Sequence, residues 1–166
     1  TRFGDPRRFR LLASGFDNRG DRALHRGEYA WRTRFALIGG EWSPDEHWSL
    51  AGEWMRGDSG MGFAPGPRVD IDFDAAYVLA SYASDDLWRY SARVESFTIR
   101  DRDGVAENND DRGHAVSVSL LRNVGANWRL GMEWLHGNSR HAAAALLGST
   151  EDTGGDFWRF EARRMF

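Results

Sequence analysis

The chain has 166 residues and a mass of 18.8 kDa, which leaves room for one domain of ordinary size. Its 22 basic and 25 acidic residues nearly balance, so no overall charge attracts polyanions, and we expect no nucleic-acid partner. Cysteine is absent, which excludes disulfide scaffolds, thiolate metal sites and cysteine nucleophiles. Aromatic residues make up 13% of the chain although its mean hydropathy is -0.61, a high share for so polar a sequence.

No segment reads as a membrane helix. The longest apolar runs, residues 75–80 and 142–147, are far shorter than the roughly 20 residues that such a helix needs. No signal peptide is visible, and the sequence opens on Thr1 rather than Met. We therefore expect either a processed mature form or a segment of a longer protein.

Alternation of apolar and polar residues with a period of two, bounded by turn residues, predicts an all-β chain that forms one domain over residues 1–166. Helical periodicity is not sustained anywhere, apart from a short helical turn expected at 141–147. The eight predicted strands are residues 7–16, 29–42, 48–57, 69–83, 88–100, 114–123, 128–137 and 156–166.

Short and long connections alternate strictly between these strands. The short ones are residues 43–47, 84–87 and 124–127, and the long, polar ones are residues 17–28, 58–68, 101–113 and 138–155. A soluble sandwich has no reason to place every short turn at one end, whereas outer-membrane barrels combine short periplasmic turns with longer outside loops. The sequence therefore predicts a transmembrane antiparallel up-and-down β-barrel in a bacterial outer membrane, with both termini on the periplasmic side.

Tryptophans recur at both ends of the predicted strands. Trp48, Trp88 and Trp128 each begin a strand directly after a short turn, where an indole ring suits a membrane interface. A second aromatic girdle is expected near the opposite strand ends, and the alternative is that all these rings are core aromatics of a soluble β-domain. The predicted girdle residues are Trp31, Trp48, Trp54, Trp88, Trp128, Trp134 and Trp158.

Splitting each strand by parity gives one apolar and one polar face. The apolar set, expected to face lipid, includes Trp31, Phe35 and Leu37 in the second strand and Ile71, Phe73, Ala75, Tyr77 and Leu79 in the fourth. In a soluble barrel the polar set would be the solvated outside, but the turn asymmetry and the girdles favour a polar lumen. The predicted pore-lining residues are Arg10, Arg32, Arg34, Glu53, Asp70, Asp72, Asp74, Arg93, Glu95, Arg129, Glu133, Arg159, Glu161 and Arg163.

The closing strand alternates up to a terminal aromatic, Phe166. With the turn and loop rhythm and the stretch 16–21 leading into 29–35, it resembles the carboxyl-terminal half of Gram-negative outer-membrane porins of the phosphate-selective type. The resemblance implies a sixteen-stranded, usually trimeric, water-filled barrel for passive diffusion of small hydrophilic solutes or ions, with eight strands in this chain. It also implies that the barrel-assembly machinery reads the closing strand, although Arg164 departs from the apolar residue often found there. The residues that match this assembly signal are Trp158, Phe160, Ala162 and Phe166.

The resemblance does not carry phosphate selectivity to this chain. The family's lysine ladder has no counterpart, because the sequence contains no lysine. Anion selectivity would have to depend on the arginines of the polar face, but acidic residues lie on the same face.

Other functions remain open at this stage. A complete eight-stranded barrel would be filled by its own salt bridges and would act as a membrane anchor or a platform for surface loops. A soluble ligand-binding barrel would reverse the two faces. An enzyme is not predicted: His114 and Ser117 have opposite parities and make a poor catalytic pair, while His136 and His141 are expected to be ordinary loop residues. The acidic loop 101–111 lacks the ligand order of an EF-hand, so no metal or cofactor is predicted.

Overall fold

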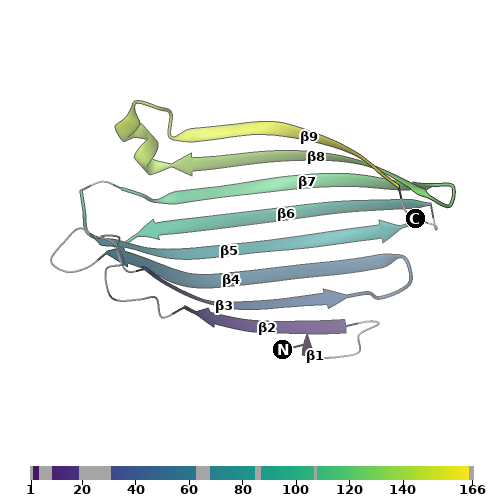
Figure 1. Cartoon of the computed structure of the whole chain (residues 1–166), viewed down its shortest axis with the longest axis horizontal. Helices are drawn as coiled ribbons and strands as arrows, with labels where there is room; N and C mark the ends of the chain where they lie inside the picture. Colours follow the sequence, from purple (N-terminus) through teal and green to yellow (C-terminus); the bar gives the residue numbers. More distant parts are fainter. Residues whose placement is uncertain are drawn as a thin grey trace.

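The chain forms one antiparallel sheet in which every strand pairs with its neighbours in sequence (Figure 1). The computed structural model describes residues 2–3, 9–18, 31–62, 68–84, 87–106 and 108–164. All eight predicted strands are confirmed as β2 to β9, and β1 was not predicted. The elements are β1 (Arg2–Phe3), β2 (Phe9–Asp17), β3 (Trp31–Trp42), β4 (Trp48–Gly62), β5 (Arg68–Ala83), β6 (Trp88–Asp101), β7 (Asp111–Val124), β8 (Trp128–His141), η1 (Ala142–Leu147) and β9 (Asp152–Arg164).

The short turns gather at one end of the sheet, called here the turn end, and η1 lies at the other, the loop end (Figure 1). In the turn between β3 and β4, the Asp45 carboxylate accepts hydrogen bonds from the backbone N–H groups of Trp48 at 2.7 Å and His47 at 2.9 Å. These two bonds lower the pKa of Asp45 below its ordinary value, since they stabilise the charged carboxylate. The side chain of one turn residue thus fixes the hairpin.

Several strands extend further toward the loop end than predicted. β4 continues to Gly62 rather than 57, β8 continues to His141 rather than 137, and β9 begins at Asp152 rather than 156. These extensions carry mostly polar and glycine residues, so apolar alternation cannot reveal them, while backbone ladder pairing does not depend on side-chain polarity. The expected helical turn is confirmed as η1, whose C-cap residue, Gly148, has a positive φ of 69°.

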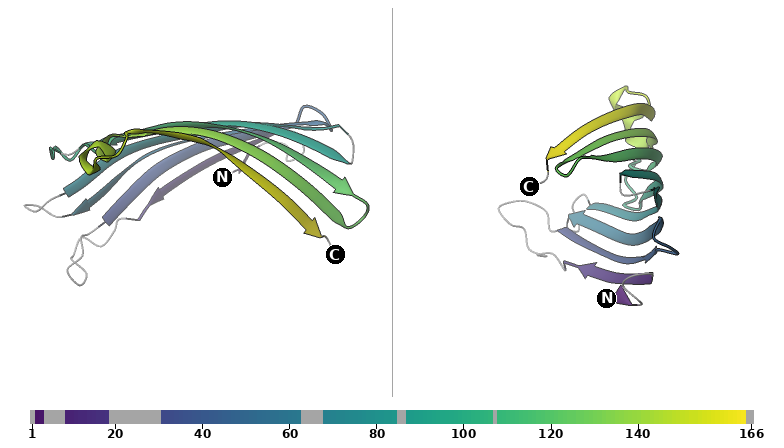
Figure 2. Two further views of the ribbon diagram at one scale, coloured as in Figure 1. Left: turned by 90° about the horizontal axis from the view of Figure 1, so that it is seen from above. Right: turned by 90° about the vertical axis from the view of Figure 1, so that its right-hand side faces the viewer.

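The sheet curves into an open trough one layer thick (Figure 2). Within the described residues β9 pairs only with β8, so the sheet is not closed into a barrel. No apolar side chain in this part of the chain is fully buried. None of the helices described is long and apolar enough to cross a membrane.

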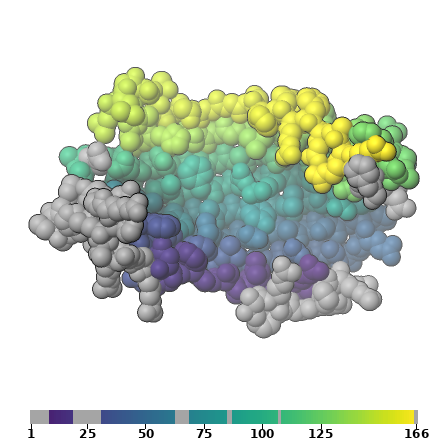
Figure 3. Space-filling view, viewed as in Figure 1, coloured from purple at the N-terminus to yellow at the C-terminus, as the bar shows by residue number. Residues whose placement is uncertain are grey.

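Pairing register assigns every side chain to one of two faces, because directly opposite residues share a face. The Cα partners run Gly39, Glu53, Tyr77 and Glu95 across β3 to β6, and the same odd parity continues through β9. Odd-numbered residues of β3 to β9 also line a hollow of about 690 Å³, which identifies theirs as the concave face, toward the viewer in Figure 3. Even-numbered residues of these strands form the convex face.

Candidate functional site

The convex face carries an uncovered apolar band. Ile38, Val78 and Val94 are exposed to 55%, 58% and 51%, although all three lie in the middle of their strands. A continuous exposed apolar surface of this kind marks a face that meets lipid or another protein. Exposed apolar residues that extend the band are Leu11, Val116, Val118, Leu130, Met132 and Phe160.

A row of tryptophans borders this band near the turn end. When the paired residues are followed across the sheet from Trp48 on β4, the line passes through Tyr90 on β6 and Met132 on β8. Trp88 lies two residues, and Trp128 four residues, closer to the turn end than those partners. The row is therefore displaced by one residue per strand, which corresponds to about 35° for strands about 4.8 Å apart that rise about 3.4 Å per residue.

A second row borders the band toward the loop end and has the same slope. The residue of β8 directly across from Trp54 is Asn138, and Trp134 lies four residues closer to the turn end. Trp158 on β9 is directly opposite Trp134, and the two rings lie 6.4 Å apart. The band thus lies between two parallel rows of indole rings.

The indole N–H groups of the second row point away from the band. Trp54 donates to Asp74 Oδ2 at 3.1 Å and Trp134 donates to Asp156 Oδ1 at 2.9 Å, and both carboxylates lie on the loop side of their tryptophan. Such rings keep an apolar body against the band and a polar group beyond it, as aromatic residues at a membrane interface do.

The convex face becomes charged beyond this row. Arg32 binds the Asp17 carboxylate with two hydrogen bonds of 3.0 and 2.7 Å, and Arg34 pairs with Asp58 at 2.5 Å. Asp72 forms an ion pair with Arg102. The loop-side part of the convex face is therefore a polar surface.

These ion pairs correct the predicted faces of β3 and β5. The expectation that Arg32, Arg34, Asp70, Asp72 and Asp74 share a face with the other predicted pore-lining residues is wrong: they lie on the convex face. The residues of β3 and β5 that were expected on the apolar outer face lie instead on the concave face. They are Trp31, Phe35, Leu37, Ile71, Phe73, Ala75, Tyr77 and Leu79.

The cause of the error is physical. β3 and β5 exchange their apolar and polar parities halfway along, because their outer side chains become charged where the apolar band ends. A parity taken from the apolar majority of one strand misses this exchange. Trp31 accordingly does not belong to the girdle; it lies on the concave face and donates to Ser59 Oγ at 3.2 Å.

Sequence reasoning missed Trp42 and Tyr82 as members of the turn-end row. Trp42 lies opposite Leu50 on the convex face, and the rings of Trp48 and Tyr82 lie 4.9 Å apart. A signal was present: Trp42 and Trp48 stand six positions apart, on either side of the turn 43–47, so both tryptophans of one hairpin have even parity.

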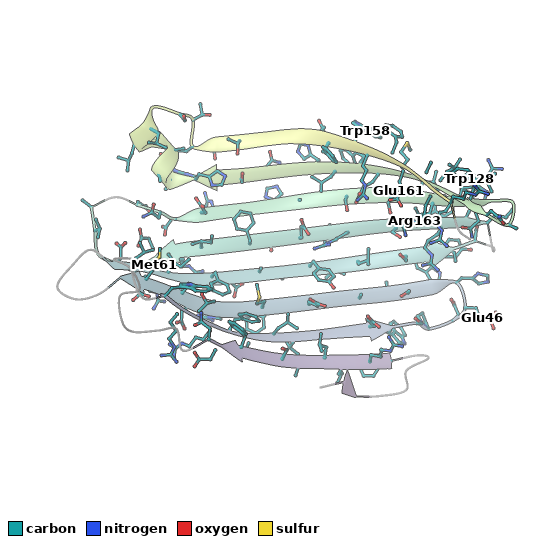
Figure 4. All side chains as sticks on the ribbon, in the orientation of Figure 1. Glu46, Met61, Trp128, Trp158, Glu161 and Arg163 are labelled. Carbon is teal, nitrogen blue, oxygen red and sulfur yellow. The ribbon has the colours of Figure 1, made fainter. Side chains whose placement is uncertain are left out.

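Charged residues on the concave face form short chains of ion pairs. Glu161 binds Arg159 at 3.2 Å and Arg163 at 2.8 Å near the turn end (Figure 4). Toward mid-strand, Arg93 binds Glu95 at 2.5 Å. The predicted pore-lining residues that the register does bring together on this face are Arg10, Glu53, Arg93, Glu95, Arg129, Glu133, Arg159, Glu161 and Arg163.

The loop-side half of the concave face is apolar and aromatic. Phe16 and Phe35 stack with ring centroids 5.2 Å apart. Gly57 leaves the space into which Phe35 and Phe73 lean, since a Cβ there would collide with both. The concave face therefore changes from charged to apolar along the strands, in the opposite sense to the convex face.

The candidate catalytic and metal-binding residues do not assemble. His114 lies on the convex and Ser117 on the concave face, as their parity predicted. His136 pairs with Asp156 and His141 with Asp111, and both histidines belong to β8, the strand that leads into the last loop. Among the residues described, no group of three or more His, Cys, Asp or Glu side chains is placed to hold a metal ion.

The acidic loop is organised by its own side chains. The Asp101 carboxylate accepts hydrogen bonds from the backbone N–H groups of Asp103 at 3.1 Å and Asn109 at 3.0 Å. These bonds lower the pKa of Asp101. The carboxylate that would be a cation ligand therefore already serves as the acceptor that shapes the loop.

The predicted assembly signal is described in part. Trp158, Phe160 and Ala162 lie on the convex face of β9, where Phe160 is 74% exposed, and Phe166 lies outside the described residues. Comparison of the chain with family models, with curated proteins and with solved structures found no match.

Proposed function

We propose that this chain forms half of the barrel of a bacterial outer-membrane porin. The convex band faces outer-membrane lipid, and the concave face lines a pore through which small hydrophilic solutes or ions diffuse. The observation that carries the proposal is the pair of parallel tryptophan rows. Their slope of about 35° lies at the lower end of the 35–45° strand tilt of outer-membrane barrels, so each row would be level with a membrane interface.

The open sheet supports a pore larger than eight strands can enclose. An eight-stranded barrel has an interior just wide enough for its own side chains. The trough instead leaves the outer edge of β9 without a partner strand among the described residues. Further strands, from more of the same protein or from another chain, would complete a barrel with a water-filled lumen, and trimer formation and delivery by the barrel-assembly machinery belong to the same proposal.

The corrected register also changes the proposed selectivity. Arg32 and Arg34 leave the lumen, so two of the arginines that could have favoured anions no longer line it. Arginines and carboxylates alternate on the concave face that remains, as in the Arg159, Glu161 and Arg163 chain. We therefore propose a pore of weak overall ion selectivity and not one specific for phosphate.

Reconstitution of the full gene product tests this function. The protein should require detergent for extraction, run faster on an unboiled denaturing gel than after boiling, and give stepwise current increases in a planar bilayer. Boiled protein is the control and should give no steps. Free solubility in buffer would refute the membrane assignment, and a detergent-folded protein without current steps would favour the closed eight-stranded barrel.

A further inference from the structure

The hollow on the concave face joins an apolar side to a charged side. It spans β3 to β9 and measures about 690 Å³, a size typical of small-molecule sites. Leu37, Met55 and Phe97 contribute apolar surface, and Glu53 and Arg93 contribute charge. A solute that fills it would therefore meet both kinds of surface at once.

The charges around the hollow do not cancel. Arg93 forms a salt bridge of 2.5 Å with Glu95, and its guanidinium lies 4.3 Å from the centroid of the Tyr77 ring. Glu53 is hydrogen-bonded to the Tyr77 hydroxyl. Within the described part of the chain no ion pair reaches Glu53, so Glu53 is the acidic lining residue that Arg93 leaves without a salt bridge.

We propose that this hollow is a binding site for amphipathic cations, which carry an amine or guanidine on an apolar body of about the size of one aromatic ring. The proposal rests on the proposed function and names the solutes that such a pore would retain. The cationic end would pair with Glu53 and the apolar body would lie against Leu37, Met55 and Phe97. An anion of the same shape would meet Glu53 and Glu95 against Arg93 alone, so the lining disfavours it.

Three probes of related structure separate the two requirements. Phenylethylammonium has the ring and the cation, phenylacetate has the ring with an anion, and ethylammonium has the cation without the ring. With the full gene product in a planar bilayer, phenylethylammonium should reduce the potassium chloride current at a concentration at least several-fold below the other two. Calorimetric titration of the detergent-purified protein should give the same order of affinities.

Two substitutions locate the site. Glu53→Gln should weaken phenylethylammonium binding about fivefold, the effect of losing one partly exposed charge pair. Phe97→Ala should weaken the same probe but leave ethylammonium unchanged. Glu133→Gln is the matched control, because Glu133 lies on the same face outside the hollow.

Equal affinities for the three probes, or a Glu53→Gln protein that binds like the unmodified one, would overturn the proposal. Current steps without probe preference would refute the binding site alone and leave the porin function standing. Probe binding in detergent without any current steps would refute the porin function and support the hollow as a ligand site. Absence of both would refute both.

Discussion

Arg34 lies directly opposite Asp58 in the register of β3 and β4, and its Nε donates to Asp58 Oδ1 at 2.5 Å on the convex face. The same parity carries Ile38 into the apolar band four residues further along β3. One face of a single strand is thus charged near the loop end and apolar toward the turn end. The change occurs beside Trp54, which lies directly opposite Ile38. The indole ring of Trp54 marks the border of the band.

The faces of β5 can be tested with spin labels, because the chain has no cysteine of its own. Val78→Cys and Leu79→Cys are adjacent positions on opposite faces, convex and concave. In the membrane, a label at 78 should be relaxed mainly by oxygen, which concentrates in lipid, and a label at 79 by a water-soluble nickel chelate. Power-saturation measurements check this, and the reverse order would restore the parity predicted from sequence alone.

A charge placed in the convex band should be costly. Met132→Arg places a guanidinium in the band between Trp128 and Trp134 of the same strand, where it should destabilise the membrane-folded protein by about 2 to 4 kcal/mol. Ser119→Arg, on the concave face of the adjacent strand β7, is the matched control and should cost far less because it faces water. Urea titration in lipid vesicles measures both free energies of unfolding. If the convex face were solvated, Met132→Arg would be nearly neutral, since Met132 is 41% exposed.

Gly57 should not tolerate a side chain. A Cβ at this position would collide with the Arg34 backbone oxygen and with the side chains of Phe35 and Phe73. Because backbone cannot move aside cheaply, Gly57→Ala should lower the free energy of unfolding by about 1 to 3 kcal/mol. Gly155→Ala is the control, since nothing lies within 4 Å of its added Cβ on the same face. Equal urea midpoints for the two variants would contradict the close approach of the phenylalanine rings.

The turn at Asp45 should stabilise the protein in a pH-dependent way. Its pKa is lowered by backbone N–H donors, so the contribution is fully present above the ordinary value of 3.8 and is lost as the pH falls through the lowered value. Asp45→Ala should therefore lower the urea midpoint at pH 7, and the gap from the unmodified protein should narrow in more acidic buffer. Glu46→Ala, at the exposed neighbouring position (Figure 4), should leave the midpoint unchanged. A gap that stays constant with pH would show that the carboxylate charge is not involved.

Local features of the sequence were sufficient for the order of the eight main strands and for the short turns, but not for the loop-side ends of β4, β8 and β9. Alternation, turn residues and the tryptophans after short turns predicted β2 to β9 and η1, and also the convex positions of Trp48, Trp88 and Trp128. Each of these depends on a few consecutive residues, so neighbouring strands are not needed to recognise it.

The faces of β3 and β5, the slope of the tryptophan rows and the hollow follow only from the pairing of strands. The faces of β3 and β5 follow from partners such as Arg34 and Asp58, because a strand whose apolar parity reverses halfway has no single apolar face to read. The slope of the tryptophan rows needs the registers of four successive strand pairs, from β4 to β8. The hollow brings together side chains that are distant in sequence, such as Glu53, Tyr77 and Arg93, because a curved sheet turns their common face inward. The sequence by itself therefore indicated which segments form the eight main strands, whereas strand pairing fixed their loop-side ends and the side of each strand that meets each surrounding.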